Sequence, residues 1–468
     1  MSQRAHTVEK IGGTSMSQFD KLLETILIGK RTGDELFNRI FVVSAYAGIT
    51  DMLLEHKKSG LPGVYSRFAN PDEEWEADLD KVLARMCEIN AGFASLGLDV
   101  VAANTIATER IQGIRACLKD LDNVCTYGHF QISDFLPAIR EMLASLGEFH
   151  SAWNSVEILK AKGINATLAD LTGWKDKQDL PFADKIRASF AGIDFDKTVV
   201  IATGYTKCSE GLMTTFDRGY SEITFSKIAC VTGAREGVIH KEFHLSSGDP
   251  KLVGIDKVKI IGRTNFDVAD QLADMGMEAI HPRASKEMEQ LDIPIRVANA
   301  FEPEHPGTLI SKDFKSPSPR VEMVTGRKDL VAIEVHDPDM VGVPGYDARI
   351  TSLLAKHKIS YIAKNTNANT ITHYLPKKSK SLQLFMTELR AEFPGANIRS
   401  EDTAIVSAIG SNINHPGFLA RAAQALADAK VNILGMNQDM RQVNMQFIVD
   451  LHDFDKAIKA MHVGLVEN

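Results

Sequence analysis

Lys10 stands directly before a glycine pair, in the stretch Lys10-Ile11-Gly12-Gly13-Thr14-Ser15. The alternating residues before it predict a strand, and a helix is expected to begin near Ser17. Backbone N–H groups and a lysine at such a loop can bind a phosphate group. The spacing is not that of a P-loop, and a Gly-Gly pair after a strand is usually only a turn. The inference that this loop binds phosphate therefore needs support from other polar segments of the chain.

Hydroxyl groups follow a second strand-like run, in Val43-Ser44-Ala45-Tyr46-Ala47-Gly48-Ile49-Thr50-Asp51. Open α/β sheets bind ligands at the carboxyl ends of their strands, where Ser44 and Thr50 would lie. An ordinary polar loop explains the same residues equally well.

Two charged residues could bind the two ends of an amino acid. Glu148 follows Gly147 and could accept an ammonium group or a ribose hydroxyl, although a solvated helix residue is the more ordinary interpretation. Arg218 lies in a Gly/Ser/Thr loop before a predicted helix at 223–230, and its planar fork matches a carboxylate. Glu222 would begin that helix, where stabilisation by the helix dipole is its ordinary role.

The segment Ser247-Gly248-Asp249-Pro250-Lys251, with Lys241 upstream, could bind a nucleotide. A surface turn is an equally good interpretation of these residues.

Residues 1 to about 300 alternate strand-like and helix-like segments, which predicts a mostly parallel sheet covered by helices on both faces. Strands are expected at 39–44 and 198–204. Residues 133–162 have helical periodicity that Gly147 interrupts, and residues 52–130 are charged and mostly helical.

Ser316-Pro317-Ser318-Pro319 predicts a linker, after which the pattern changes and repeats. Each copy contains a strand, a Gly/Pro loop, an amphipathic helix (346–357 or 418–429) and a further strand (359–362 or 431–434). Two copies about 70 residues apart predict duplicated β-α-β-β-α-β domains.

The composition excludes several classes of protein. The chain has 468 residues, a formal net charge of −8 and 44% hydrophobic residues. This acidic balance argues against nucleic-acid binding. The chain lacks an apolar run long enough to span a membrane. Five scattered cysteines form no CxxC pair, which argues against a disulfide framework or zinc site and favours a cytoplasmic location.

Taken in order, K-I-G-G-T-S, V-S-A-x-A-G-I-T-D, L-G-E, T-T-x-x-R-G-x-S, D-P-K and I-H-P-R (280–283) resemble the motifs of aspartate kinases in the amino-acid kinase superfamily. The tandem repeats resemble ACT domains. The resemblance covers nearly the whole chain and implies MgATP-dependent phosphorylation of L-aspartate at its β-carboxylate. It implies an α/β fold with a mostly parallel open sheet and two ferredoxin-like βαββαβ domains. Domains are expected at 1–312 (kinase), 320–395 and 400–468 (ACT), and a strand from 296–311 could complete the last of them.

The resemblance also implies roles for individual residues. Catalytic residues would be Lys10, Gly12, Gly13, Arg218 and Glu222. L-Aspartate would be bound by Ser44, Thr50, Glu148, Arg218 and Ser221. ATP would be bound by Lys10, Gly13, Thr14, Ser15, Thr232, Asp249 and Lys251, with Mg²⁺ as cofactor and no protein metal site.

Some positions depart from the family pattern. The usual G-R-G-G-S-D loop is Asp217-Arg218-Gly219-Tyr220-Ser221-Glu222 here, so Tyr220 replaces a glycine and Glu222 an aspartate. The nucleotide segment is longer than usual. These departures suggest a divergent subgroup such as the kinases of ectoine synthesis.

ACT domains pair across subunits and bind amino acids, so a homodimer or a tetramer with an amino-acid effector is expected. Lysine-sensitive relatives bind lysine with a serine and an aspartate, where this chain has Ser360 and Ile362. Weak or absent inhibition by lysine is therefore expected. The alternatives are a kinase for glutamate or N-acetylglutamate and an inactive amino-acid sensor.

Overall fold

The computed structural model describes residues 5–57, 59–216, 219–277, 280–379 and 381–467. These residues form two compact units, Met1–His244 with Ile280–Lys312, and Leu245–Ala279 with Asp313–Asn468. The segment 245–279, expected within the kinase domain, thus groups with the second unit.

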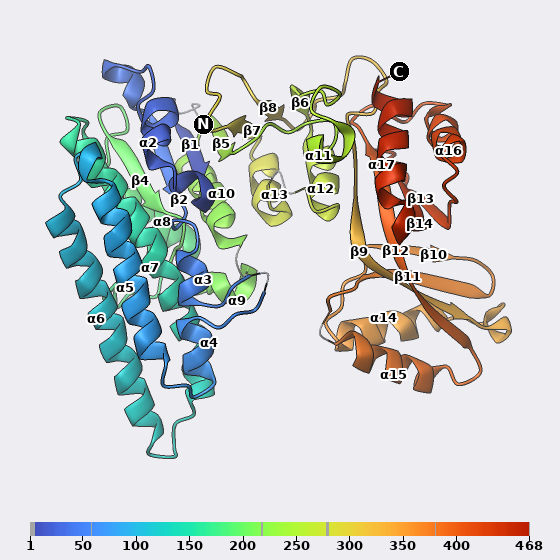
Figure 1. Ribbon diagram of the computed structural model, residues 1–468, viewed down its shortest axis with the longest axis horizontal. Coiled ribbons are helices and arrows are strands. Elements are labelled where there is room, and N and C mark those ends of the chain that lie inside the picture. The colour runs from blue at the N-terminus through green and yellow to red at the C-terminus, as the bar shows by residue number, and fades with distance from the viewer. Residues whose placement is uncertain (1–4, 58, 217–218, 278–279, 380, 468) are drawn as a thin grey trace. The chain divides into compact units, whose positions relative to one another are not determined.

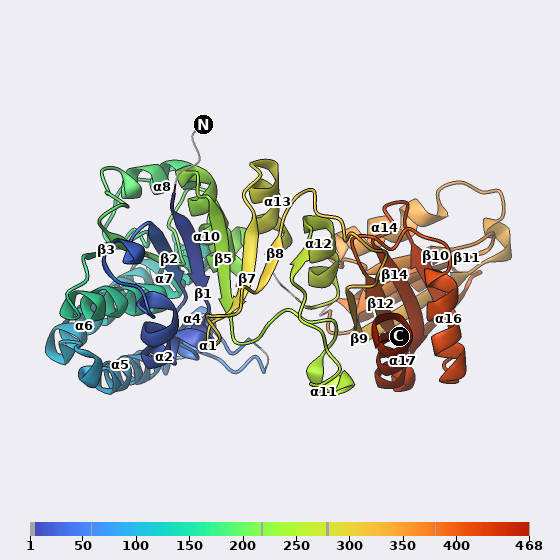
Figure 2. The ribbon, with the colours of Figure 1, turned by 90° about the horizontal axis from the view of Figure 1, so that it is seen from above.

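A mostly parallel sheet runs through the first unit, with strand order β3-β4-β2-β1-β5-β7-β8 (Figures 1 and 2). Every neighbouring pair is parallel except β7 and β8, which are antiparallel. The strands are β1 (Thr7–Ile11), β2 (Arg39–Val43), β3 (Ala166–Ala169), β4 (Val199–Thr203), β5 (Glu236–Lys241), β7 (Ile295–Asn299) and β8 (Thr308–Ile310). This confirms the predicted sheet, including the strands expected near 39–44 and 198–204.

Helices occupy most of the remaining first unit, and the long helices α5, α6 and α7 lie side by side (Figure 1). The helical segments are α1 (Gly13–Met16), α2 (Phe19–Leu22), η1 (Leu23–Leu27), η2 (Gly33–Leu36), α3 (Ile49–Leu53), α4 (Val64–Ala69), α5 (Trp75–Gly92), η3 (Ala94–Leu96), α6 (Val100–Cys125), α7 (Ile132–Ala161), α8 (Phe182–Phe190), α9 (Leu212–Phe216), α10 (Tyr220–Thr232) and α13 (Pro282–Gln290).

Gly147 does not interrupt α7, contrary to the expectation from sequence. A Cβ atom at this position would lie 2.7 Å from Ala45 Cβ and 2.9 Å from Ile49 Cγ2. The glycine therefore lets the loop after β2 pack directly on the middle of the helix.

The two faces of this sheet carry different chemistry, because successive side chains of β1 point to opposite faces. Lys10 faces α10, which packs against β1. Glu9 lies on the other face, where Arg39 Nη1 donates to the carbonyl of Leu27 at 3.3 Å. The segment η1 therefore covers part of the Glu9 face.

The second unit contains a six-stranded antiparallel sheet of order β10-β11-β9-β12-β14-β13. Its strands are β9 (Met323–His336), β10 (Ala363–Thr366), β11 (Thr370–Pro376), β12 (Asn397–Ile409), β13 (Gly435–Gln438) and β14 (Asn444–Asp450). The remaining elements of this unit are α11 (Pro250–Val253), β6 (Arg263–Thr264), α12 (Phe266–Asp274), η5 (Pro338–Met340), α14 (Tyr346–Lys356), α15 (Leu382–Glu392), α16 (Phe418–Asp428), η6 (Leu451–Asp453), α17 (Phe454–His462) and η7 (Val463–Glu467).

The long strands β9 and β12 each serve both repeats. Residues 397–403 of β12 pair with the second half of β9, and 405–409 pair with its beginning, 323–327. The strand that completes the second repeat is therefore 323–327 and not 296–311, whose strands β7 and β8 belong to the first sheet.

The predicted repeat helices agree with α14 and α16, whereas the strands expected at 359–362 and 431–434 begin later, as β10 and β13. Each repeat has a hydrophobic core of its own, one around Phe385 and the other around Phe447. The expected linker is irregular in structure but packed, because Ser316 is buried and its N–H donates to Ser411 Oγ at 2.9 Å.

Within the described residues, the helices are all too short or too polar to cross a membrane.

Candidate functional site

A largely buried lysine–carboxylate pair lies at the carboxyl end of β1. Lys10 Nζ lies 3.4 Å from Glu222 Oε1, and each side chain is only 14% exposed. Glu222 stands in the first turn of α10, as the sequence predicted. Two residues that are 212 positions apart in the sequence therefore meet at the carboxyl ends of the strands, where α/β folds bind ligands.

Glu222 is held as a carboxylate by its surroundings. Burial alone would raise its pKa, but the charges of Lys10 and Lys241 and the His281 N–H outweigh burial and lower the pKa below its usual value. The His281 N–H donates to Oε2 at 2.7 Å. The ionised Glu222 can therefore orient Lys10, whose ammonium group is available to a phosphoryl group.

Glu148 provides a second carboxyl group, buried where α7, α10 and the end of β4 meet. Its Oε1 accepts a hydrogen bond of 2.8 Å from Ser221 Oγ, which comes from the first turn of α10. Its Oε2 is buried and has no partner of ordinary hydrogen-bond geometry among the described residues. A Cβ atom on Gly204 would lie 3.0 Å from this oxygen, so the glycine after β4 leaves room beside it.

The environment of Glu148 favours its protonated form. Burial raises its pKa to about 8, although hydrogen bonds from Ser221 and Tyr220 and the charge of Lys10 oppose the shift. A cationic ligand at Oε2 would lower this pKa, because an opposite charge favours the carboxylate. Glu148 is therefore suited to bind an ammonium group.

The loop after β2 lies against α7. The Ser44 N–H donates to the Ile11 carbonyl at 3.1 Å, and Ser151 Oγ of α7 donates to the Ser44 carbonyl at 2.8 Å. Thr50 stands in the first turn of α3, and both Ser44 and Thr50 are half-buried. Since β1, β2 and β4 are adjacent and parallel, Ser44 lies beside Lys10 at the carboxyl ends of these strands.

The glycine loop turns into a helix earlier than predicted, because α1 begins at Gly13 rather than near Ser17. Thr14 is exposed, whereas Ser15 is buried and its hydroxyl donates to Glu242 Oε1 at 2.7 Å. Ser15 thus ties this turn to the end of β5, while Gly12 and Gly13 lie at the turn itself.

A side chain at Gly13 should destabilise the fold. A Cβ atom there would lie 2.5 Å from the Ala45 carbonyl oxygen, whereas at Gly12 the nearest atom, Lys10 Nζ, would be 3.8 Å away. We expect Gly13→Ala to lower the free energy of unfolding by about 1–3 kcal/mol, as overpacking does. Gly12→Ala is the matched control, measured by the same denaturant titration. Equal stability of the two variants would contradict this packing.

Comparison with known proteins agrees with this geometry. Residues 6–299 match the amino acid kinase family, and residues 406–465 match the ACT domain. Aspartate kinase Ask_Ect of Stutzerimonas stutzeri (strain A1501) is 53% identical over 464 residues, which cover 99% of this chain and 98% of that protein. This chain belongs to the aspartate kinases of the amino acid kinase family. A more distant relative is the chloroplastic aspartokinase 1 of Arabidopsis thaliana, 26% identical over 70% of this chain and 61% of its own length.

Solved structures share the fold. The crystal structure of E. coli aspartokinase III in complex with aspartate and ADP has a TM-score of 0.72 at 20% identity, covering 98% of this chain and 99% of that one. The aspartate kinase of Clostridium acetobutylicum gives the same TM-score at 18% identity, covering 98% of this chain and all of its own.

Not every predicted residue of this aspartate kinase joins the group around Lys10. Thr232 lies at the last turn of α10, where its hydroxyl contacts His6 Nε2 at 2.9 Å and donates to Ile228 O. Because ten residues of helix span about 15 Å, Thr232 lies far from Glu222. Arg218 lies outside the described residues.

Asp249 and Lys251 belong to the second unit. Asp249 caps α11 by accepting the Lys251 N–H at 2.9 Å, and Lys251 itself is exposed. The preceding Ser247 lies 2.9 Å (Oγ to Nε2) from His462 of α17, so this segment is fixed to the carboxyl-terminal helix.

Sequence reasoning missed Glu141, which fixes the start of α9. Its carboxylate accepts the N–H groups of Met213 and Thr214 at the start of α9, at 2.7 and 3.2 Å, and the Tyr205 hydroxyl at 2.7 Å. Glu141 precedes Glu148 by two helical turns, so both lie on one face of α7. The sequence signal that could have revealed Glu141 is its seven-residue spacing from Glu148.

Tyr220, which replaces a family glycine, needs no unusual backbone in this aspartate kinase. It is the first residue of α10 and is not among the residues with positive φ. Its buried ring packs edge-on against Tyr205, with centroids 5.8 Å apart. Tyr220 therefore occupies the position of the glycine without an unusual backbone angle of its own.

Proposed function

We propose that the group around Lys10 and Glu148 transfers the γ-phosphoryl group of ATP to the β-carboxylate of L-aspartate. A carboxylate oxygen attacks the γ-phosphorus, the bond from that phosphorus to the β–γ bridging oxygen breaks, and ADP leaves with 4-phospho-L-aspartate formed. The observation that carries the proposal is the buried Oε2 of Glu148, which has no partner of ordinary hydrogen-bond geometry among the described residues and lies near the Lys10–Glu222 pair.

Glu148 would accept the α-ammonium group of aspartate, and Ser221 would hold the carboxyl group in place. Ser44 and Thr50 would donate hydroxyl hydrogen bonds to aspartate and the transferred group. Arg218 would bind the α-carboxylate, a role proposed from its motif alone.

Lys10 would neutralise the charge on the transferring phosphoryl group, with N–H groups of Gly12 and Gly13 as further donors. Phosphoryl transfer depends mainly on such positioning and charge stabilisation. The attacking carboxylate is already ionised at pH 7, so the reaction needs no general base.

Mg²⁺ would arrive with the nucleotide, because this ion takes many of its ligands from substrate phosphates. Thr14, Ser15, Asp249 and Lys251 are the remaining proposed nucleotide contacts. Asp249 and Lys251 rest on sequence motif, and Ser15 would have to exchange its bond to Glu242.

Hydroxylamine trapping tests the reaction, because an acyl phosphate gives a coloured hydroxamate. We expect product with MgATP and L-aspartate, and none above background with L-glutamate or N-acetylglutamate. N-Acetylglutamate lacks the ammonium group that Glu148 would bind. Product with either alternative alone would overturn the substrate assignment, and ATP binding without any product would favour an amino-acid sensor.

Lysine should inhibit weakly or not at all. Ser360 is exposed and Ile362 is half-buried, both in the segment that leads into β10. Isoleucine cannot pair with the lysine ammonium group, and burying that charge unpaired is unfavourable. Activity measured at 10 mM L-lysine should therefore stay close to the uninhibited rate, whereas a micromolar inhibition constant would contradict this expectation.

We also propose a cytosolic homodimer that pairs through its ACT repeats and belongs to the ectoine-pathway subgroup. The altered 217–222 loop and the 53% identity to Ask_Ect support the subgroup. The described cysteines are free, which suits a reducing compartment.

A further inference from the structure

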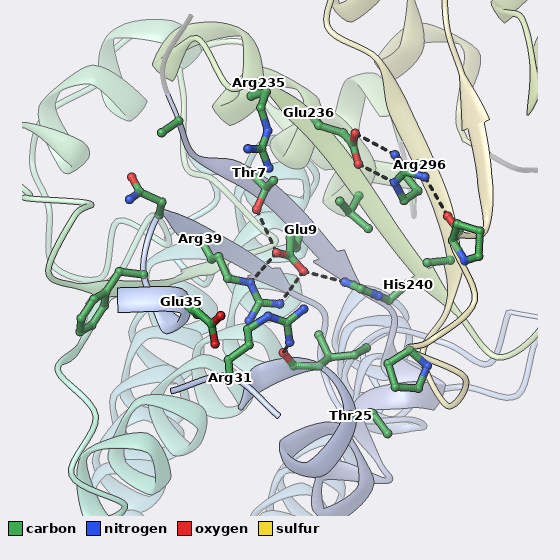
Figure 3. Close-up of a pocket in the computed structure, with 18 of the residues that line it drawn as sticks. Thr7, Glu9, Thr25, Arg31, Glu35, Arg39, Arg235, Glu236, His240 and Arg296 are labelled. Carbon is green, nitrogen blue, oxygen red and sulfur yellow. Dashed lines mark hydrogen bonds and ion pairs between the residues drawn. The ribbon is translucent and has the colours of Figure 1, made fainter. Parts of the chain in front are cut away.

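A cavity of about 740 Å³ opens on the Glu9 face of the first sheet. Its floor consists of β1, β2, β5 and β7, and η1 and the segment 31–39 form one wall (Figure 3). Because Glu9 and Lys10 are successive residues of one strand, the cavity lies on the opposite face from the proposed catalytic group.

The charged groups on its floor already have partners. Glu9 accepts hydrogen bonds from Arg39 Nε at 2.7 Å and Arg39 Nη2 at 3.0 Å, and His240 Nε2 lies 2.8 Å from its Oε2. Although burial opposes ionisation, these contacts hold the pKa of Glu9 well below its usual value. Arg296 and Glu236 form a second pair, with contacts of 2.7 and 3.1 Å.

Arg31 is different, because it carries a charge without a carboxylate partner among the described residues. Its guanidinium donates only to the Ile26 carbonyl, at 3.1 Å, and it lies beside the Arg39 guanidinium (Figure 3). Burial and the charge of Arg39 lower the pKa of Arg31, and together they outweigh the opposing charges of Glu9 and Glu35.

The acidic residues closest in sequence compensate the charge of Arg31 only in part, because neither forms an ion pair with it among the described residues. Glu35 accepts the Thr32 N–H at 3.2 Å and completes a capping box at η2. Asp34 is exposed and lines the same cavity, but it forms no ion pair with another described residue.

Arg235 provides a second cation. It lines the same cavity and extends toward Thr7 (Figure 3). Within the described ranges, no carboxylate lies within ion-pair distance of its side chain. Guanidinium groups match carboxylate and phosphate oxygens in two-point contacts.

We propose that this cavity binds a small anion with more than one phosphate or carboxylate group, which contacts Arg31 and Arg235. The bound anion would supply the negative charge that these two guanidinium groups lack. This site does not depend on the proposed reaction, because none of its residues belongs to the catalytic group.

Calorimetric titration of the full chain tests the proposal, with pyrophosphate and tricarballylate as probes of the two anion classes. Saturating ADP and L-aspartate, without Mg²⁺, keep the catalytic group filled. We expect one anion per chain, and at least tenfold weaker binding in Arg31→Met and in Arg235→Met. The matched control is Lys30→Met, which removes the same charge from an 87% exposed side chain paired with Glu304.

The stronger probe identifies the anion class. Arg235 is exposed, so its replacement should preserve the fold, and a thermal melt checks both arginine variants. Failure of both probes to bind at millimolar concentration would overturn the proposal. Equal affinity in the wild type and both arginine variants would overturn it as well, as would binding that disappears once ADP and L-aspartate are present.

Discussion

Replacing Lys10 with methionine should lower kcat by about a hundred- to a thousandfold, the usual cost of removing one preorganised donor to a developing negative charge. The side chain is nearly buried and held by Glu222, so its ammonium group needs little reorganisation when the phosphoryl group transfers. The aspartate KM should change much less, because the proposed amino-acid contacts remain. Steady-state kinetics with MgATP in excess measure both constants.

Lys21→Met is the matched control for this prediction. Lys21 is exposed on α2 and its Nζ donates to Gln18 Oε1, so its loss removes an equal charge without touching the site. A kcat for Lys10→Met within threefold of the control would show that Lys10 has no part in the chemical step.

Replacing Glu148 with glutamine should raise the aspartate KM by about ten- to a hundredfold, since a hydrogen bond to a charged group contributes about 1.5–3 kcal/mol. The glutamine keeps the shape of the side chain and can still contact Ser221, but it cannot pair with an ammonium group. Glu157→Gln, on the same helix, is the control. An unchanged KM would contradict the role of Glu148.

The same substitution should not destabilise the ligand-free protein at pH 8.5. The pKa of Glu148 is about 8 in the folded chain, above its ordinary value of 4.5. Between these values the folded state binds more protons than the unfolded state, so this group lowers the free energy of unfolding as the pH rises. Glutamine removes that effect. Thermal melts at pH 6 and 8.5 should therefore show that the melting temperature of Glu148→Gln, relative to that of the wild type, is higher at pH 8.5 than at pH 6.

Local patterns predicted most of the fold. The apolar runs that became β2 and β4 and the periodic helices α14 and α16 depend on neighbouring residues, which the sequence displays directly. The motifs also predicted that Glu222 would begin α10, and the structure brings it to Lys10.

Long-range packing decided what the sequence could not show. Gly147 resembles a helix breaker, but it lies in a continuous helix because Ala45 and Ile49 pack where a side chain would be. The strand that completes the second repeat comes from 323–327, a pairing that local alternation cannot reveal. Thr232 lies on the same helix as Glu222, but the ten residues of helix between them place the two about 15 Å apart.

Proton release on aspartate binding tests the central claim most directly. Calorimetry at pH 7 in buffers of different ionisation enthalpy gives the number of protons released per L-aspartate bound. If Glu148 is protonated in the free protein and ionised against the ammonium group, about one proton should be released by the wild type and none by Glu148→Gln. Equal proton release by the two proteins would contradict the proposed role of Glu148 as the ammonium receptor.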